Sequence, residues 1–265
     1  MTYADVGGLR IWYEEHGTGK PLVLLHGGYG STETFAPVRQ ALAARRRLIA
    51  VDLRGHGRTG GLDRPLRYES MADDVAGLLR HLGLPNADVL GYSLGGGVAL
   101  RTAIQHPALV RRLVLVSTPF RRRGWYPETL AAMSAHDERA AERMRGTPPY
   151  ERYARLAPRP QDWPLLWTRN GELLRRDYDW SAEVAALPMP VLLVFADADE
   201  IPVSHAAEFF GLLGGDHRDA GGDGAARPAS RLAVLPGLTH YDVVASPALP
   251  AAVLPFLTHP ARAPG

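Results

Sequence analysis

The chain has 265 residues, 46% of them hydrophobic, and contains no cysteine. This size allows one large hydrophobic core, so we expect one domain with an elaboration rather than two equal domains. The absence of cysteine excludes disulfides and cysteine–metal sites. A formal net charge of +2 is too small to indicate a nucleic-acid partner, despite arginine runs at 45–47 and 121–123.

The N-terminal residues, MTYADVGGLRIWYEEHG, lack the basic-then-apolar pattern of a signal peptide. No apolar run approaches the length of a membrane span. We therefore expect a cytoplasmic protein without a membrane partner.

The strands come first in chain order. The segment DVGGLRIWYEEHG alternates polar and apolar residues around a Gly-Gly turn, which predicts two strands at an antiparallel edge. Six later apolar runs are mostly continuous, as in strands that are buried on both faces of a mainly parallel sheet. These runs cover residues 21–27, 47–52, 87–93, 111–117, 190–197 and 231–237.

Helical patterns separate several of these runs. Residues 70–83 place apolar side chains at helical spacing after Ser70, a predicted N-cap followed by Asp73 three residues later. Residues 204–215 and 246–257 predict two further helices, the second with Pro247 at its first position. The alternation of strand and helix predicts the α/β class with right-handed crossovers.

Residues 120–187 break this alternation, because they contain no strand-like run. We interpret them as a helical cap inserted into a core domain made of residues 1–119 and 188–265. The aromatic side chains of the cap are explained more simply by packing than by a pocket; they are Trp125, Tyr126, Trp163, Trp167, Tyr178 and Trp180. A glycine- and alanine-rich segment at 214–230 predicts a loop.

The segment GYSLG at 91–95 is a candidate nucleophile elbow, since it matches G-x-S-x-G between a strand-like and a helix-like run. A serine on such a sharp turn exposes its hydroxyl, and side chains two positions away would collide there. The amide dipoles of the following helix favour a developing negative charge beside Ser93. Gly96 and Gly97 are expected to serve close packing of that helix.

A serine nucleophile needs a base and an orienting carboxylate. His240 follows the last apolar run, in a loop that can reach the carboxyl ends of the strands. Asp199 and Asp197 both lie just past the run at 190–197, so the chemistry alone leaves either open as the acid, with Glu200 a weaker third.

An acyl-transfer intermediate also needs two backbone donors for its oxyanion. One is the amide of Leu94, directly after the serine. The glycine-rich HGGYG segment after the first central run supplies the other, and Gly28 is the candidate donor.

A rival interpretation is dinucleotide binding, because GHGRTG at 55–60 fits G-x-G-x-x-G after a strand-like run. The following segment, GLDRPLRYES, opens no helix directly on these glycines. The context that a phosphate-binding turn needs is therefore missing.

In these motifs the chain resembles the serine-dependent α/β-hydrolase superfamily over nearly its whole length. The resemblance is carried by HGG at 26–28, DLRGHG at 52–57, GYSLGG at 91–96, Asp199 and His240. It implies the α/β-hydrolase fold: a mainly parallel eight-stranded sheet with one antiparallel strand, flanking helices and a helical cap. It also implies a Ser93–Asp199–His240 triad, with Asp199 rather than Asp197 as the acid, and architectural roles for Asp52 and His56.

Two positions depart from the family pattern. Ala196 and Thr239 stand where glycine is common, before the acid and the histidine. Neither removes a catalytic group, although Thr239 can alter how His240 enters the site.

Size and motifs resemble the esterase, enol-lactonase and haloperoxidase-like branch. The expected activity is hydrolysis of a small carboxylic ester or lactone through an acyl-enzyme, without metal or cofactor. The alternatives are a C–C bond hydrolase or a member repurposed for non-hydrolytic biosynthesis or ligand binding. The sequence leaves open whether the chain is a monomer or a homodimer.

Overall fold

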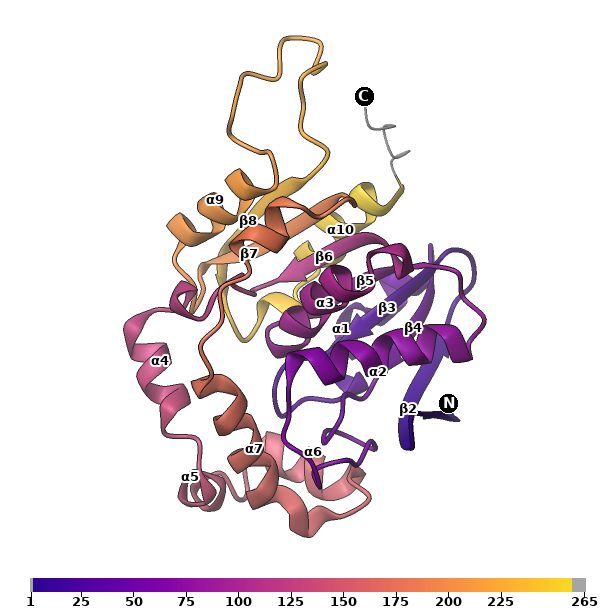
Figure 1. Cartoon of the computed structure of the whole chain (residues 1–265), viewed down its shortest axis with the longest axis vertical. Coiled ribbons are helices and arrows are strands. Elements are labelled where there is room, and N and C mark those ends of the chain that lie inside the picture. The colour runs from indigo at the N-terminus through magenta and orange to yellow at the C-terminus, as the bar shows by residue number, and fades with distance from the viewer. Residues whose placement is uncertain (1, 259–265) are drawn as a thin grey trace.

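A computed structural model describes residues 2–258, and its centre is an eight-stranded sheet in the order β1-β2-β4-β3-β5-β6-β7-β8 (Figure 1). All eight expected strands are present. Their bounds are β1 Thr2–Val6, β2 Leu9–His16, β3 Pro21–Leu25, β4 Arg47–Val51, β5 Ala87–Tyr92, β6 Val110–Val116, β7 Val191–Ala198 and β8 Arg231–Thr239.

Strand direction follows the hydrophobic patterns. The alternating segment forms the β1–β2 hairpin, and β2 is antiparallel to both of its neighbours, β1 and β4. From β4 to β8 every pairing is parallel. The carboxyl ends of these six strands therefore meet at one edge of the sheet, where loops from distant parts of the chain come together.

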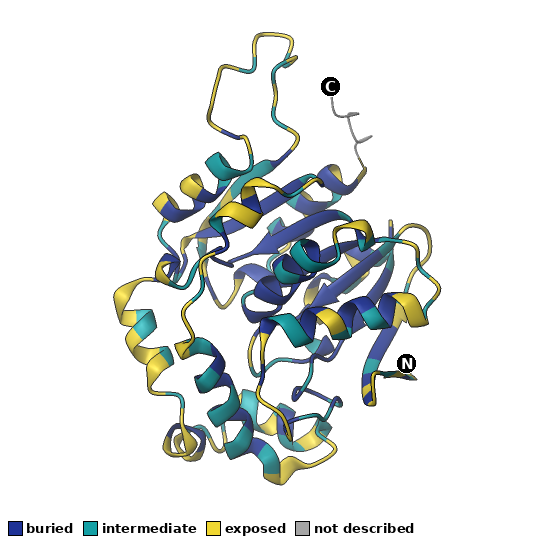
Figure 2. Cartoon of the chain, in the orientation of Figure 1, coloured by how far each residue is buried: buried dark blue, intermediate teal, exposed yellow. Residues whose placement is uncertain are grey.

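Helices cover both faces of the sheet, which explains why the central runs are apolar throughout. Val23 and Leu25 of β3 pack in a core with α2 (Tyr68–His81) and α3 (Leu94–Gln105). Leu22 and Leu24 face the opposite core, beneath α1 (Ala36–Ala43) and α10 (Ala248–Thr258). Figure 2 shows the resulting band of buried strands between the two helical layers.

Two helix starts differ from the sequence prediction. The α2 helix begins at Tyr68 after Arg67, so Ser70 is not its N-cap; the Ser70 hydroxyl instead donates to the Arg67 carbonyl oxygen at 3.2 Å. Helix α10 begins at Ala248, one residue after Pro247. The predicted helix at 204–215 is α9 (Val203–Leu212). Among the residues that the structure describes, no helix is long and apolar enough to cross a membrane.

Between β6 and β7 the chain is helical, and most of these helices gather at one end of the molecule, whereas the last of them lies beside α9 near the sheet (Figure 1). They are α4 Pro127–Ser134, α5 Glu138–Arg143, α6 Pro148–Leu156, α7 Trp163–Arg175 and α8 Ser181–Ala185. Most of the aromatic side chains here are core residues: Trp163, Trp167 and Trp180 are buried. The division of the chain into a core domain and a cap of residues 120–187 stays our interpretation.

Two other segments complete the framework. Residues 214–230 form a loop that projects from the end of the molecule opposite α4–α7 (Figure 1). At 55–60, Gly55 and Gly57 have positive φ values in a tight turn, and the next helix starts only at Tyr68. This segment is thus a structural turn rather than the strand–turn–helix of a dinucleotide site.

Candidate active site

Ser93 lies on the sharp turn between β5 and α3, with φ 53° and ψ −119°. A non-glycine residue in this conformation is strained, and the Ser93 amide is tied to the Val116 carbonyl oxygen at 2.9 Å. A Cβ atom on Gly91 would collide with the backbone of Gly95, and one on Gly95 would collide with the Leu25 carbonyl. Both glycines therefore make the turn possible.

His240 and Asp199 complete a hydrogen-bonded chain with Ser93. Nε2 of His240 is 3.0 Å from the Ser93 hydroxyl oxygen, and Nδ1 is 2.8 Å from Oδ1 of Asp199. His240 and Asp199 are buried, whereas Ser93 is partly exposed. The structure thus brings the three candidate residues together in the geometry of nucleophile, base and orienting acid.

The surroundings of the two aspartates distinguish them. Asp199 Oδ1 also accepts the Glu200 amide at 2.8 Å, and Oδ2 accepts the Ala196 amide at 3.2 Å and the Ser117 hydroxyl. Asp197 is exposed and accepts the Leu238 amide at 3.2 Å. Only Asp199 of the pair contacts the histidine.

Ser117 is a site residue that the sequence analysis did not identify. It is fully buried at the end of β6, and its φ of 50° turns the chain beneath the Asp199 carboxylate. Its position at the end of the apolar run 111–117 was the only available signal. Nothing local in that run indicates that the hydroxyl meets a carboxylate 82 residues later.

The loop that carries His240 is held from both sides. Tyr92 donates its hydroxyl to the His240 carbonyl oxygen at 2.8 Å. The Trp125 ring meets the imidazole edge-on at 5.5 Å between centroids. Thr239, which replaces the common glycine, donates its amide to Asp242 at 2.6 Å. A tight turn therefore accommodates threonine in place of the common glycine before the histidine.

The candidate oxyanion donors lie on either side of Ser93. Leu94 is the first residue of α3, and Gly28 follows β3 in an exposed position with open space above its Cα. Neither amide has a hydrogen-bond acceptor among the described residues. Gly27 lies against the serine: a Cβ on it would be 3.3 Å from the Ser93 Cβ. The loop after β3 thus reaches the nucleophile.

A buried histidine supports this loop. His26 accepts the Leu53 amide on Nε2 at 3.0 Å, so its Nδ1 carries the proton and donates to the Gly27 carbonyl oxygen at 2.7 Å. Burial, together with the neighbouring His56, lowers the pKa of His26 to about 3. A neutral imidazole therefore joins the ends of β3 and β4 next to the oxyanion donor.

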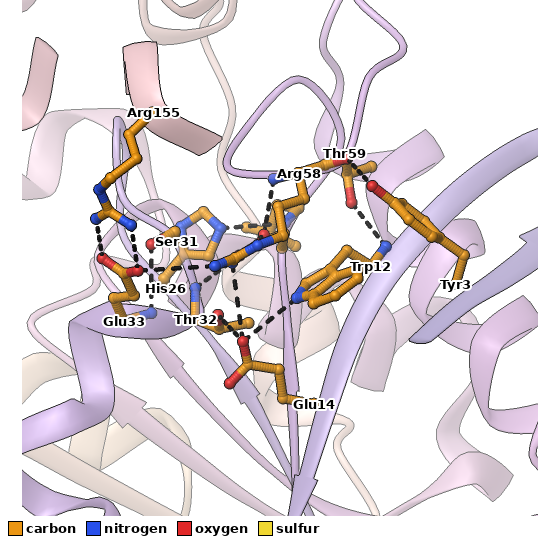
Figure 3. Close-up of polar contacts among 12 residues, drawn as sticks. Tyr3, Trp12, Glu14, His26, Ser31, Thr32, Glu33, Arg58, Thr59 and Arg155 are labelled. Carbon is orange, nitrogen blue, oxygen red and sulfur yellow. Dashed lines mark hydrogen bonds and ion pairs between the residues drawn. The ribbon is translucent and has the colours of Figure 1, made fainter. Parts of the chain in front are cut away.

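Asp52 and Arg58 hold the far end of the same loop. Asp52 accepts the amides of Thr32 at 2.6 Å and Arg58 at 2.8 Å. The Arg58 guanidinium lies 3.7 Å from Glu33 and 3.8 Å from Glu14 (Figure 3). These contacts give Asp52 the architectural role expected from the sequence.

Helix α6 reaches this network through Arg155. Its guanidinium binds the Glu33 carboxylate with two hydrogen bonds, at 3.0 and 2.7 Å (Figure 3). We call residues 26–30, the segment after β3 that contains Gly28, the oxyanion loop. Since Glu33 follows this loop by only a few residues, the helical insertion and the loop are joined at this point.

Tyr29 forms a second contact between the oxyanion loop and the insertion. It follows Gly28 directly and has a φ of 57°. Its ring stacks on Trp167 of α7 at 4.2 Å between centroids. Its hydroxyl is 2.8 Å from Nδ1 of His136. Burial raises the pKa of Tyr29 and lowers that of His136, so a protonated phenol donates to a neutral imidazole.

The arrangement can take a proton from Ser93, stabilise an imidazolium and bind an oxyanion. That set of abilities serves nucleophilic attack on a carbonyl carbon. Among the described residues no cluster of three or more histidine or acidic side chains has the geometry of a metal site.

Arginines of the two basic runs form ion pairs within the fold. Arg46 pairs with buried Asp88 at 3.1 Å, and Arg121 pairs with Glu208 at 2.6 Å.

Comparison with known proteins identifies relatives of the whole fold. Residues 20–202 match the family model described as alpha/beta hydrolase fold. An AB hydrolase superfamily protein of Bacillus subtilis is 31% identical over 225 residues, which cover 76% of this chain and 82% of that protein. The sn-1-specific diacylglycerol lipase ABHD11 of Xenopus laevis is 36% identical over 126 residues, or 46% of this chain.

Among solved structures, the enol-lactonase from Burkholderia xenovorans has a TM-score of 0.73 and 21% identity, with 97% of this chain and all of that chain covered. At that identity the likeness concerns the fold. The match to the frog lipase spans only 40% of that protein's own length, and another relative is matched over 44% of its length. The family match over most of the chain and the Bacillus relative establish that this chain belongs to the α/β-hydrolase family.

Proposed function

We propose that this protein is a serine hydrolase that cleaves a small carboxylic ester or lactone through an acyl-enzyme intermediate. The observation that carries the proposal is the unbroken chain from Ser93 through His240 to Asp199, with distances of 3.0 and 2.8 Å. The lipase and enol-lactonase among its relatives agree with carboxyl-ester chemistry.

The mechanism follows from the contacts. Nε2 of His240 takes the proton of Ser93 as the serine oxygen attacks the substrate carbonyl carbon. Asp199 accepts Nδ1–H, holds the tautomer and stabilises the imidazolium. The amides of Gly28 and Leu94 bind the oxyanion that forms.

The same groups complete acylation and then carry out deacylation. His240 gives its proton to the leaving alcohol, and the acyl group stays on Ser93. Water then enters, loses a proton to His240 and attacks the acyl carbon. His240 returns this proton to the Ser93 oxygen as its bond to the acyl carbon breaks, which releases the acid and restores the serine.

A panel of chromogenic esters and lactones with different acyl lengths tests the proposal. We expect the wild type to hydrolyse part of the panel and Ser93→Ala to lose at least about 1,000-fold in kcat/KM, because the nucleophile is gone. His240→Ala should lose a similar factor, and circular dichroism should show both variants folded.

A fluorophosphonate probe provides a control that is independent of the substrate. It should label the wild type and not Ser93→Ala. Full ester turnover by Ser93→Ala would reject the mechanism. Labelling of Ser93 without turnover of any ester or lactone would instead favour the alternative of C–C bond hydrolysis, which a 1,5-diketone substrate in the same panel examines.

A further inference from the structure

Glu200 places a second carboxylate beside the proposed catalytic base. Its Oε2 is 3.8 Å from Nε2 of His240, the nitrogen that faces Ser93. Its side chain is 26% exposed, so the carboxylate is open to the solvent side of the site. The proposed mechanism assigns no task to this charge.

Glu200 is hydrogen-bonded to two neighbours, one through its side chain and one through its backbone. Its Oε1 accepts the Tyr241 hydroxyl at 2.6 Å, which leaves Oε2 on the His240 side. Its carbonyl oxygen accepts the Tyr126 amide at 3.1 Å. The Tyr241 hydrogen bond therefore orients the carboxylate with its second oxygen towards the imidazole.

The residues around Glu200 expose aromatic surface. Tyr241 is 73% and Tyr126 39% exposed, and both are among the few large hydrophobic side chains that are exposed in the described part of the chain. We call Glu200, Tyr126 and Tyr241 the acidic rim. Trp125, next to Tyr126, is buried and meets the His240 imidazole edge-on.

Carboxylates gather around the histidine loop: Asp199 and Glu200 lie beside the imidazole, and Asp242 accepts the Thr239 amide. Burial, and then the charges of Asp199 and Glu200 with further contributions from Tyr241 and Asp242, raise the pKa of the Tyr92 hydroxyl beneath the histidine loop. A substrate carboxylate placed here would meet like charge, whereas a positive group would meet an available carboxylate oxygen.

We propose that the acidic rim binds a cationic ammonium group in the leaving-group part of the substrate. A carboxylate combined with exposed aromatic rings attracts ammonium ions by charge and by the negative faces of the rings. This inference rests on the proposed ester hydrolysis and assigns its substrate class: esters with an amino or quaternary ammonium alcohol.

A matched substrate pair tests this charge preference. Acetylthiocholine and S-(3,3-dimethylbutyl) thioacetate have nearly the same shape, but only the first carries a positive charge. We expect the wild type to prefer the cation about tenfold in kcat/KM. In Glu200→Gln the ratio of the two kcat/KM values should fall towards one. Glu142→Gln, which removes an exposed carboxylate on α5, should keep the wild-type ratio.

The ratio separates substrate recognition from a general effect on the base. If Glu200 acted only through His240, its replacement would slow both substrates equally, and an unchanged ratio would overturn the proposal. A wild-type ratio near one would overturn it as well.

A binding experiment keeps the proposal separate from the hydrolytic function. Choline and its neutral isostere 3,3-dimethylbutan-1-ol are titrated against the wild type and Glu200→Gln by calorimetry. Binding of choline alone, lost in the variant, supports the rim even if no ester is hydrolysed. Equal binding of both alcohols, or of neither, rejects it.

Discussion

At the scale of single residues, Ser117 shows how the acid of the proposed triad is held. Its hydroxyl donates to the Asp199 oxygen that does not face His240. The Ala196 amide also donates to that oxygen, at 3.2 Å. The carboxylate is thus oriented from below by a side chain that does not touch the histidine.

Replacement of Ser117 by alanine is predicted to lower kcat for ester hydrolysis about tenfold, because one hydrogen bond to a buried carboxylate is lost. KM should change little, since Ser117 does not reach the substrate. Ser181→Ala is the matched control, because Ser181 also bonds an aspartate, Asp179, but at an exposed position. Equal rates for the two variants would show that Ser117 does not position the acid.

The two aspartates at the end of β7 give a second residue-scale prediction. Asp199→Asn should lower kcat by about 1,000-fold or more, because an amide no longer accepts Nδ1–H and the wrong tautomer is stabilised. Asp197→Asn should stay within about threefold of the wild type, since Asp197 is exposed and accepts the backbone amide of Leu238 in β8. The reverse order of rates would identify Asp197 as the acid.

At the scale of elements, the oxyanion loop is held between the sheet and the helical insertion. The β3 end ties it to β4 through His26. Helices α6 and α7 hold it through Arg155 and through Trp167, which stacks on Tyr29. Because Tyr29 has a positive φ next to the candidate donor Gly28, loss of its packing should let the loop relax.

Tyr29→Ala is therefore predicted to lower kcat about tenfold or more with a smaller effect on KM, since the oxyanion forms only in the transition state. Affinity for a trifluoromethyl ketone, which forms a tetrahedral adduct with serine, should fall in parallel. Tyr29→Phe keeps the stack on Trp167 and should restore most of the rate. If Tyr29 is merely a wall of the acyl pocket, the Ala variant will change KM and acyl-length preference instead.

At the scale of the whole molecule, buried neutral histidines make stability depend on pH. Burial lowers the pKa of His26 to about 3, and those of His56 and His205 to about 4. In the unfolded chain each titrates near its ordinary value of about 6.5. Below that pH the unfolded state binds protons that the folded state does not bind.

We predict that the free energy of unfolding falls as the pH decreases from about 6.5 towards 4, by up to about 1.4 kcal/mol per pH unit for each of these histidines. Thermal unfolding followed by circular dichroism between pH 8 and pH 4.5 measures this slope. His205→Gln should reduce this dependence of the free energy of unfolding on pH by the contribution of one histidine. A melting temperature that stays level from pH 7 to pH 5 would contradict the prediction.

The sequence by itself determined the strands, the α/β class and the positions of Ser93 and His240. Each of these depends on a local pattern, such as a buried apolar run or glycines around a serine, which short-range sterics and burial translate directly into structure. Element ends were less accurate: α2 starts at Tyr68, after an extended Arg67 that makes no side-chain capping hydrogen bond, so no capping residue marks this start in the sequence.

The tertiary structure alone decided which side chains surround the proposed triad. From the residues themselves Asp197 and Asp199 were equivalent, and only the meeting of β7 with the histidine loop places one of them at 2.8 Å from the imidazole. Ser117, the Tyr29 stack and the acidic rim likewise join segments that are far apart in the chain. Such contacts arise when parallel strands bring their carboxyl ends to one edge, and no periodicity within a single segment encodes them.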